Sequence, residues 1–350
     1  MKRVFCKNFK RLYWFFIFVV SILTTGTFVS SKSVIAQELN IYSHRQPFLI
    51  KPFTSAFRKI TGVKVNVVFA AKGLVQRLKA EGSRSPADLI LTVDIARLDF
   101  YAQKGLFTPV ASKVLNANIP SYLREKNNLW YALSKRARVL AIAKGRVKPN
   151  EIKRIEDLEK PEWKGKICTR KGSHVYNRAL LSSIIAANGK MSAEKWVKGL
   201  ISNLARRPQG NDRAQIKAIA QGVCDVAIIN HYYFFKMKNS KNQAQRDWVK
   251  SVRILFLNQG DRGNHINVTG IGVAKHSKNK NNAIRFMEFL SNDFAQNLYA
   301  KINYEYPIKL SVKPSVEVLS LGKFKEDQLP IGLIAKLAPD AQKIINRVGW

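Results

Sequence analysis

Segments typical of strands and of helices alternate along the chain, and this alternation most constrains its fold. Short apolar runs at 63–69 and 87–93 are each followed by a helix-like segment, at 73–81 and 95–104. The pattern restarts at 139–143. Alternation of this kind is typical of a largely parallel sheet with helices on its faces. We therefore predict an α/β fold.

Two positions divide this pattern. The seam at 134–138 and the Gly/Asn-containing stretch 259–264 are candidate hinge crossings. They predict a first lobe from 37–136 plus 263–350 and a second lobe from 137–262. Each lobe is expected to be a mixed, mostly parallel sheet flanked by helices, with a hinge between them. A ligand would bind in the crevice between lobes, where strand ends and loops meet.

The first 36 residues have the pattern of a secretory signal peptide: a basic start, an apolar run at 12–23 and small residues before Ala36. A bilayer-spanning helix needs about 20 apolar residues, so we expect cleavage after Ala36. An uncleaved membrane anchor is the alternative. The mature chain would have 314 residues, enough for two domains.

The charge of the chain is strongly positive, formally +37, and +31 after the six basic residues of the first 36 are removed. Such a charge attracts polyanions, but the lysines are scattered rather than clustered in a motif, and export separates the protein from nucleic acid. We therefore expect no nucleic-acid partner. Association with anionic membranes and compositional drift both remain open as explanations of the charge.

No enzyme class is indicated. The sequence has no Gly-x-Ser-x-Gly elbow, no His-Glu-x-x-His motif and no phosphate-binding loop. Carboxylates number only 23, and no pair of them stands out for acid–base work. We expect a binding protein.

Two cysteines, Cys168 and Cys224, remain in the mature chain. In an oxidising compartment they can form a disulfide. Two buried free thiols are the alternative, and the sequence does not decide between them.

Tyrosines form the best cluster for ligand chemistry. Tyr232 and Tyr233 directly follow a buried strand-like run at 225–230, and Tyr176 lies just before a helix. A phenolate is a hard oxygen donor that suits Fe(III), although tyrosine clusters more often serve packing. Neighbours on a strand point to opposite faces. Both tyrosines can therefore reach one ion only if the chain leaves strand geometry there.

Several motifs, in the same order, resemble the periplasmic ferric-iron-binding proteins that serve iron ABC transporters. The resemblance covers nearly the whole mature chain. Its motifs are Ile41–Phe48, Ser85–Asp88 with Thr92–Asp94, Arg136–Val139, Ala205–Gly210, Tyr232–Tyr233 and Asn303–Pro307.

The resemblance implies a type II periplasmic binding protein, a monomer that binds ferric iron in the periplasm and delivers it to an inner-membrane ABC permease. The family's adjacent tyrosine pair and its third tyrosine correspond to Tyr232, Tyr233 and Tyr176. We therefore expect these three to be the metal ligands. An anion, a ferric chelate or an organic ligand such as a thiamine-like compound, bound on the same fold, is the alternative.

The chain also departs from the family pattern. Some relatives have further ligands at positions that correspond to Gln46, Pro47 and Val93. Their absence implies the subgroup that uses three tyrosines and completes the shell with carbonate or bicarbonate, with citrate, or with water. Arg45 and Arg136 are the expected partners of that anion. His44, next to Arg45, is a possible extra ligand.

Overall fold

A mixed sheet runs through residues 38–350, the part of the chain that the computed structural model describes. The predicted signal peptide lies outside the described residues. The strands are β1 (Glu38–Ser43), β2 (Lys64–Phe69), β3 (Leu89–Thr92), β4 (Phe107–Thr108), β5 (Tyr131–Ala143), β6 (Ile167–Cys168), β7 (Val226–Asn230), β8 (Val252–Leu255), β9 (Ile266–Ala274) and β10 (Tyr306–Pro307). Their main order is β2-β1-β3-β9-β5-β7-β6.

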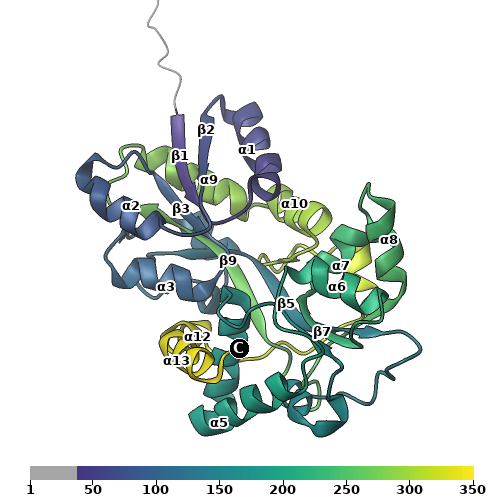
Figure 1. The fold of residues 1–350 in the computed structure, drawn as a ribbon. Helices are drawn as coiled ribbons and strands as arrows, with labels where there is room; N and C mark the ends of the chain where they lie inside the picture. Colours follow the sequence, from purple (N-terminus) through teal and green to yellow (C-terminus); the bar gives the residue numbers. More distant parts are fainter. Residues whose placement is uncertain (1–37) are drawn as a thin grey trace, which may run out of the picture. The chain divides into compact units, whose positions relative to one another are not determined.

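Helices surround this sheet (Figure 1). They are α1 (Pro47–Thr61), α2 (Leu74–Glu81), α3 (Ile95–Gln103), α4 (Lys113–Asn118), α5 (Val175–Ser202), α6 (Asp212–Ala220), α7 (His231–Lys238), α8 (Gln243–Lys250), α9 (Lys280–Ser291), α10 (Asp293–Asn303), α11 (Val316–Leu319), α12 (Ile331–Lys336) and α13 (Ala338–Val348). In α5, a break at Gly189, whose φ is 80°, divides the helix into two parts. Among residues 38–350, no helix is both long and apolar enough to span a bilayer.

The sheet is mixed, as predicted, but antiparallel pairing is more extensive than the alternation suggested. Parallel pairs join β1 to β2 and β3, and β6 to β7. The long strands β5 and β9 pair antiparallel with each other, and β9 does so with β3 and β5 with β7. The two strands at the centre of the order therefore run against their neighbours.

Strand β5 changes partner along its length. Its first part, Tyr131–Ala137, pairs with β9, and Arg138–Ile142 pairs with β7. The predicted hinge segment 134–138 includes this change of partner. The sequence predicted only 139–143 as strand because the preceding residues are polar. Those polar residues are buried here, since other side chains pair with them; Ser134, for example, donates to Glu305.

The apolar core consists of separate clusters. One gathers side chains from 39–133 and from 268–335, together with Ala179. The other two gather side chains from 137–257 together with C-terminal residues, among them Tyr306, Val318 and Ile345. Parts of 306–350 thus pack with the second set, whereas the predicted division placed all of 263–350 in the first lobe. The division into lobes stays a prediction.

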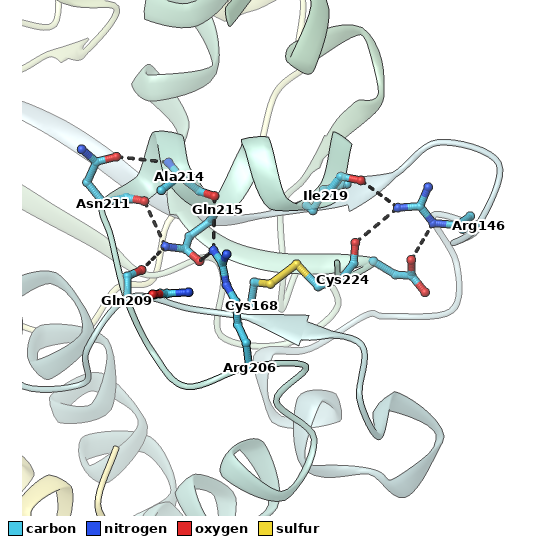
Figure 2. Close-up of a disulfide and its surroundings, with 10 residues drawn as sticks. Arg146, Cys168, Arg206, Gln209, Asn211, Ala214, Gln215, Ile219 and Cys224 are labelled. Atoms are coloured by element: carbon cyan, nitrogen blue, oxygen red, sulfur yellow. Dashed lines mark hydrogen bonds and ion pairs between the residues drawn. A yellow bond between two sulfur atoms is a disulfide. The ribbon is translucent and has the colours of Figure 1, made fainter. Parts of the chain in front are cut away.

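A disulfide joins Cys168, at the end of β6, to Cys224, just before β7 (Figure 2). Their Cα atoms are 5.9 Å apart. Arg146 donates to the carbonyl oxygens of Ile219 and Cys224, which lie beside the bridge. Both Cys168 and Cys224 are buried. The bridge therefore fixes the base of β7, the strand that leads to Tyr232 and Tyr233.

Candidate metal centre

The three predicted tyrosine ligands lie in the first turns of two helices. Tyr176 is the second residue of α5, and the side chain of His174 caps this helix by accepting from the backbone N–H of Tyr176. Helix α7 begins at His231, directly after β7, so Tyr232 and Tyr233 are helical rather than extended. The chain therefore leaves strand geometry at the point where the prediction required it to.

These tyrosines lie close together. The phenol oxygens of Tyr176 and Tyr232 are 3.4 Å apart. The rings of Tyr232 and Tyr233 are stacked with 4.4 Å between centroids. Tyr176 and Tyr232 are buried and Tyr233 is half-buried, and all three line one cavity of about 170 Å³. Three hard oxygen donors on one wall of a cavity are a suitable partial shell for a trivalent ion.

Both members of the tyrosine pair are protonated at neutral pH in the absence of a cation. Burial, followed by the proximity of Tyr176 and Tyr233, raises the pKa of Tyr232 well above its ordinary value. Burial, followed by Tyr176 and Asp212, also raises the pKa of Tyr233. A bound cation must therefore displace these protons, which only a highly charged ion does well.

A buried polar network connects the starts of the two helices. Asp212 accepts from Arg138 at 2.8 Å, from Arg170 at 3.0 Å and from the backbone N–H of Asn230 at 2.8 Å. Arg138 also donates to the side chains of Asn230 and Asn177, the residues next to or near the tyrosines. Burial would raise the pKa of Asp212, but the two arginines and the Asn230 N–H keep it lowered. This network fixes the positions of Tyr176 and Tyr232 relative to each other.

Guanidinium groups surround the tyrosine rings. Those of Arg136 and Arg170 lie 5.2 and 5.3 Å from the Tyr176 centroid, and that of Arg213 lies 5.5 Å from the Tyr233 centroid. Positive charge at this distance stabilises phenolates. It also repels an incoming cation and attracts anions.

The sequence did not identify several cavity residues. These are Arg97, Arg170, His174, Arg213 and Lys236. Arg170 and His174 precede Tyr176 by only a few positions, so closeness to a predicted ligand was an available signal. Arg97 comes from α3, far away in the sequence, and no local pattern could have placed it here.

Both predicted anion-binding arginines line the cavity, but each already has partners. Arg45 is buried and pairs with Glu305 at 2.9 Å and with the Thr269 hydroxyl at 2.8 Å. Arg136 donates to the carbonyl oxygen of Val93 and, at 3.4 Å, to the Thr269 hydroxyl. It forms no ion pair with a carboxylate of residues 38–350, so it has more capacity left for an anion than the carboxylate-paired Arg45.

The predicted extra ligand, His44, also lines the cavity, but both its ring nitrogens are engaged. Nδ1 lies 2.7 Å from the carbonyl oxygen of Ala70, so it donates, and Nε2 lies 2.8 Å from the Tyr101 hydroxyl. Burial, with Arg97 nearby, lowers the pKa of His44 to about 4, so the ring is neutral at pH 7. Nowhere in 38–350 do three or more His, Cys, Asp or Glu side chains form a metal-binding group.

Comparison with known proteins places this chain in a family. Residues 84–323 match the model of the bacterial extracellular solute-binding proteins. The chain belongs to this family. Iron uptake protein A1 of Synechocystis is 42% identical over 90% of this chain and 88% of its own length. The family binds solutes, which supports the expectation that this chain is not an enzyme and that it works outside the cytoplasm.

Solved structures agree over nearly their whole length. Apo ferric ion-binding protein A of Pasteurella haemolytica matches with a TM-score of 0.86 and 44% identity, over 90% of this chain and 98% of its own. The Trichodesmium FutA protein, solved with iron and citrate ligands, matches with a TM-score of 0.84 and 41% identity, over 89% and 99%. These matches confirm the predicted fold class and the predicted resemblance to ferric-iron-binding proteins.

Proposed function

We propose that this solute-binding protein carries ferric iron, held by the phenolates of Tyr176, Tyr232 and Tyr233. The observation that carries the proposal is the convergence of these side chains, with the Tyr176 and Tyr232 oxygens 3.4 Å apart. The names of the relatives, an iron uptake protein and a ferric ion-binding protein, support the same solute. Iron is the cargo here and not a resident cofactor.

Charge balance calls for an anion in the shell. Three phenolates neutralise Fe(III), and Arg136, Arg170 and Arg213 then leave surplus positive charge around the tyrosines. Carbonate, bicarbonate or citrate would offset that surplus and supply further oxygen donors. Arg136 is its first partner, because it lines the cavity and, unlike Arg45, forms no ion pair with a carboxylate of the described residues.

We infer the route of the iron from the family. After removal of residues 1–36, the protein would bind iron in the periplasm as a monomer and deliver it to the permease of an ABC importer in the inner membrane. The predicted lobes are 37–136 plus 263–350 and 137–262. Iron binding between these lobes would favour a closed arrangement that the permease recognises.

The visible spectrum tests the proposal. The mature protein, mixed with ferric citrate and bicarbonate, should gain the charge-transfer band of an iron–phenolate complex. Tyr176→Phe and Tyr233→Phe should lose or shift the band. Tyr122→Phe, which alters a tyrosine that is 59% exposed and does not line the cavity, is the matched control. A folded protein without the band would favour an anion or an organic ligand as the solute.

A further inference from the structure

A second cavity lies next to the candidate metal centre. It measures about 800 Å³ and is formed by α2, α3, the start of α5 and the residues of α12 and α13. His44, Ala71, Arg97 and Val175 line both cavities. The two cavities therefore adjoin at these shared side chains.

Cations line this second cavity and lack ion-pair partners. They are Lys72, Arg97, Arg178 and Lys336, and none of them pairs with a carboxylate of residues 38–350. The single lining carboxylate, Asp99, instead accepts from the side chain of Gln103 at 2.5 Å. The cavity therefore carries a net positive charge and has room for an organic molecule.

Two of these cations lie close to the shared wall. Arg97 donates one hydrogen bond, of 3.0 Å, to the Ala71 carbonyl oxygen. Arg178 donates to Gln342 at 3.2 Å, and its buried Nε has no partner within 38–350. Burial and then, more weakly, the charge of Arg178 lower the pKa of Arg97, while Asp94 opposes this. Two guanidiniums with unused donors and no intervening carboxylate favour a bound carboxylate or phosphate.

The metal centre has a matching need for negative charge. The first loop offers Gln46 and Pro47 rather than charged ligands, so three tyrosines leave several positions on a six-coordinate ferric ion open. Around that ion Arg97, Arg136, Arg213 and Lys236 have no carboxylate partner among the described residues. A carbonate supplies two negative charges. A polycarboxylate supplies more, and it is longer than a carbonate.

On the basis of the proposed function, we propose that the second cavity is a subsite for the pendant carboxylate of an organic chelator bound to the iron. The substrate is then a ferric hydroxycarboxylate complex. The chelator coordinates the ion beside the tyrosines, Arg97 lies between the two cavities, and Arg178 and Lys336 hold the far carboxylate.

The double variant Arg178→Gln, Lys336→Gln tests this subsite without altering a tyrosine. Iron affinity is measured with ferric citrate and, separately, with bicarbonate as the added anion. The matched control, Arg253→Gln, Lys313→Gln, removes one exposed arginine and one exposed lysine that do not line either cavity. We expect about a 10-fold loss of affinity for ferric citrate, from two lost charge-assisted hydrogen bonds, and less than about a 2-fold change with bicarbonate.

An equal loss with both anions, or no loss with citrate, would overturn the subsite. A native protein that binds iron with neither anion would instead refute the proposed function. In that case, calorimetry with metal-free citrate still tests whether the subsite exists. Weaker citrate binding by the double variant than by the control supports the subsite, and equal or absent binding by both rejects it.

Discussion

Two walls of the metal cavity differ in what they offer an ion. The tyrosine wall, Tyr176, Tyr232 and Tyr233, presents phenol oxygens that have few other partners. The first-loop wall, His44 and Arg45, lines the same cavity, but its polar atoms are largely engaged by Ala70, Tyr101, Thr269 and Glu305. The difference indicates that one wall supplies the ligands and the other supplies shape and charge.

The largest expected effect is on the tyrosine wall. Tyr232→Phe should weaken ferric iron binding more than 100-fold, beyond the 10–100-fold that loss of an outer-shell partner costs. Its hydroxyl contacts the Tyr176 hydroxyl at 3.4 Å, which is long for a hydrogen bond, so the fold should survive. Competition titration with a chelator measures the affinity, and thermal unfolding checks the fold. Near-native affinity in the folded variant would remove Tyr232 from the site.

Acidification should act through the same wall. Because the pKa values of Tyr232 and Tyr233 are raised by burial, both groups hold a proton at pH 7 and must lose it when iron binds. Affinity then falls as pH falls, by about 10-fold per pH unit for each displaced proton. Proton release in a weakly buffered solution measures this directly, after correction for the iron donor. Release of less than one proton per ion would contradict the tyrosinate account.

A smaller effect is expected behind the tyrosine wall. Asp212→Asn weakens the network that connects Arg138, Arg170 and Asn230, and should lower iron affinity about 10-fold. Breaking a buried ion pair also costs about 3–5 kcal/mol of unfolding free energy. Asp225→Asn, which loses the more exposed pair with Arg146, is the control. Urea unfolding and titration measure the two effects; unchanged affinity would show that the network does not position the tyrosines.

The smallest effect is expected on the first-loop wall. His44→Ala removes a ring whose nitrogens contact the Ala70 carbonyl oxygen and the Tyr101 hydroxyl, and it should change iron affinity less than about 3-fold if no metal bond is lost. The same competition titration measures it. A loss of affinity as large as that of Tyr232→Phe would show that His44 leaves its partners and binds the metal. The two walls would then not differ in whether they supply ligands.

The tyrosine wall could be predicted from local sequence together with the resemblance to ferric-iron-binding proteins. Tyr232 and Tyr233 are adjacent and follow an apolar strand, and Tyr176 opens a helix. The partners of the first-loop wall could not be predicted in this way. Arg45 pairs with Glu305, 260 positions away, so this ion pair depends on the tertiary fold.

The polar interior of β5 was missed for a similar reason. Its segment before 139 reads as polar in the sequence, yet Arg136 and Arg138 are buried because Asp212, Asn230 and Val93 accept from them. Periodicity detects apolar faces, and it does not detect strands whose polar side chains are paired across the fold. The alternation of strands and helices, by contrast, was sufficient for the fold class.

An anomalous difference map at the iron edge, from crystals of the iron-loaded protein, would locate the ion relative to the tyrosines. We expect a single strong peak within bonding distance of the phenol oxygens of Tyr176, Tyr232 and Tyr233, with His44 still bound to Ala70 and Tyr101. A peak that contacts fewer than two of these tyrosines, or one bound mainly by the first-loop wall, would contradict it.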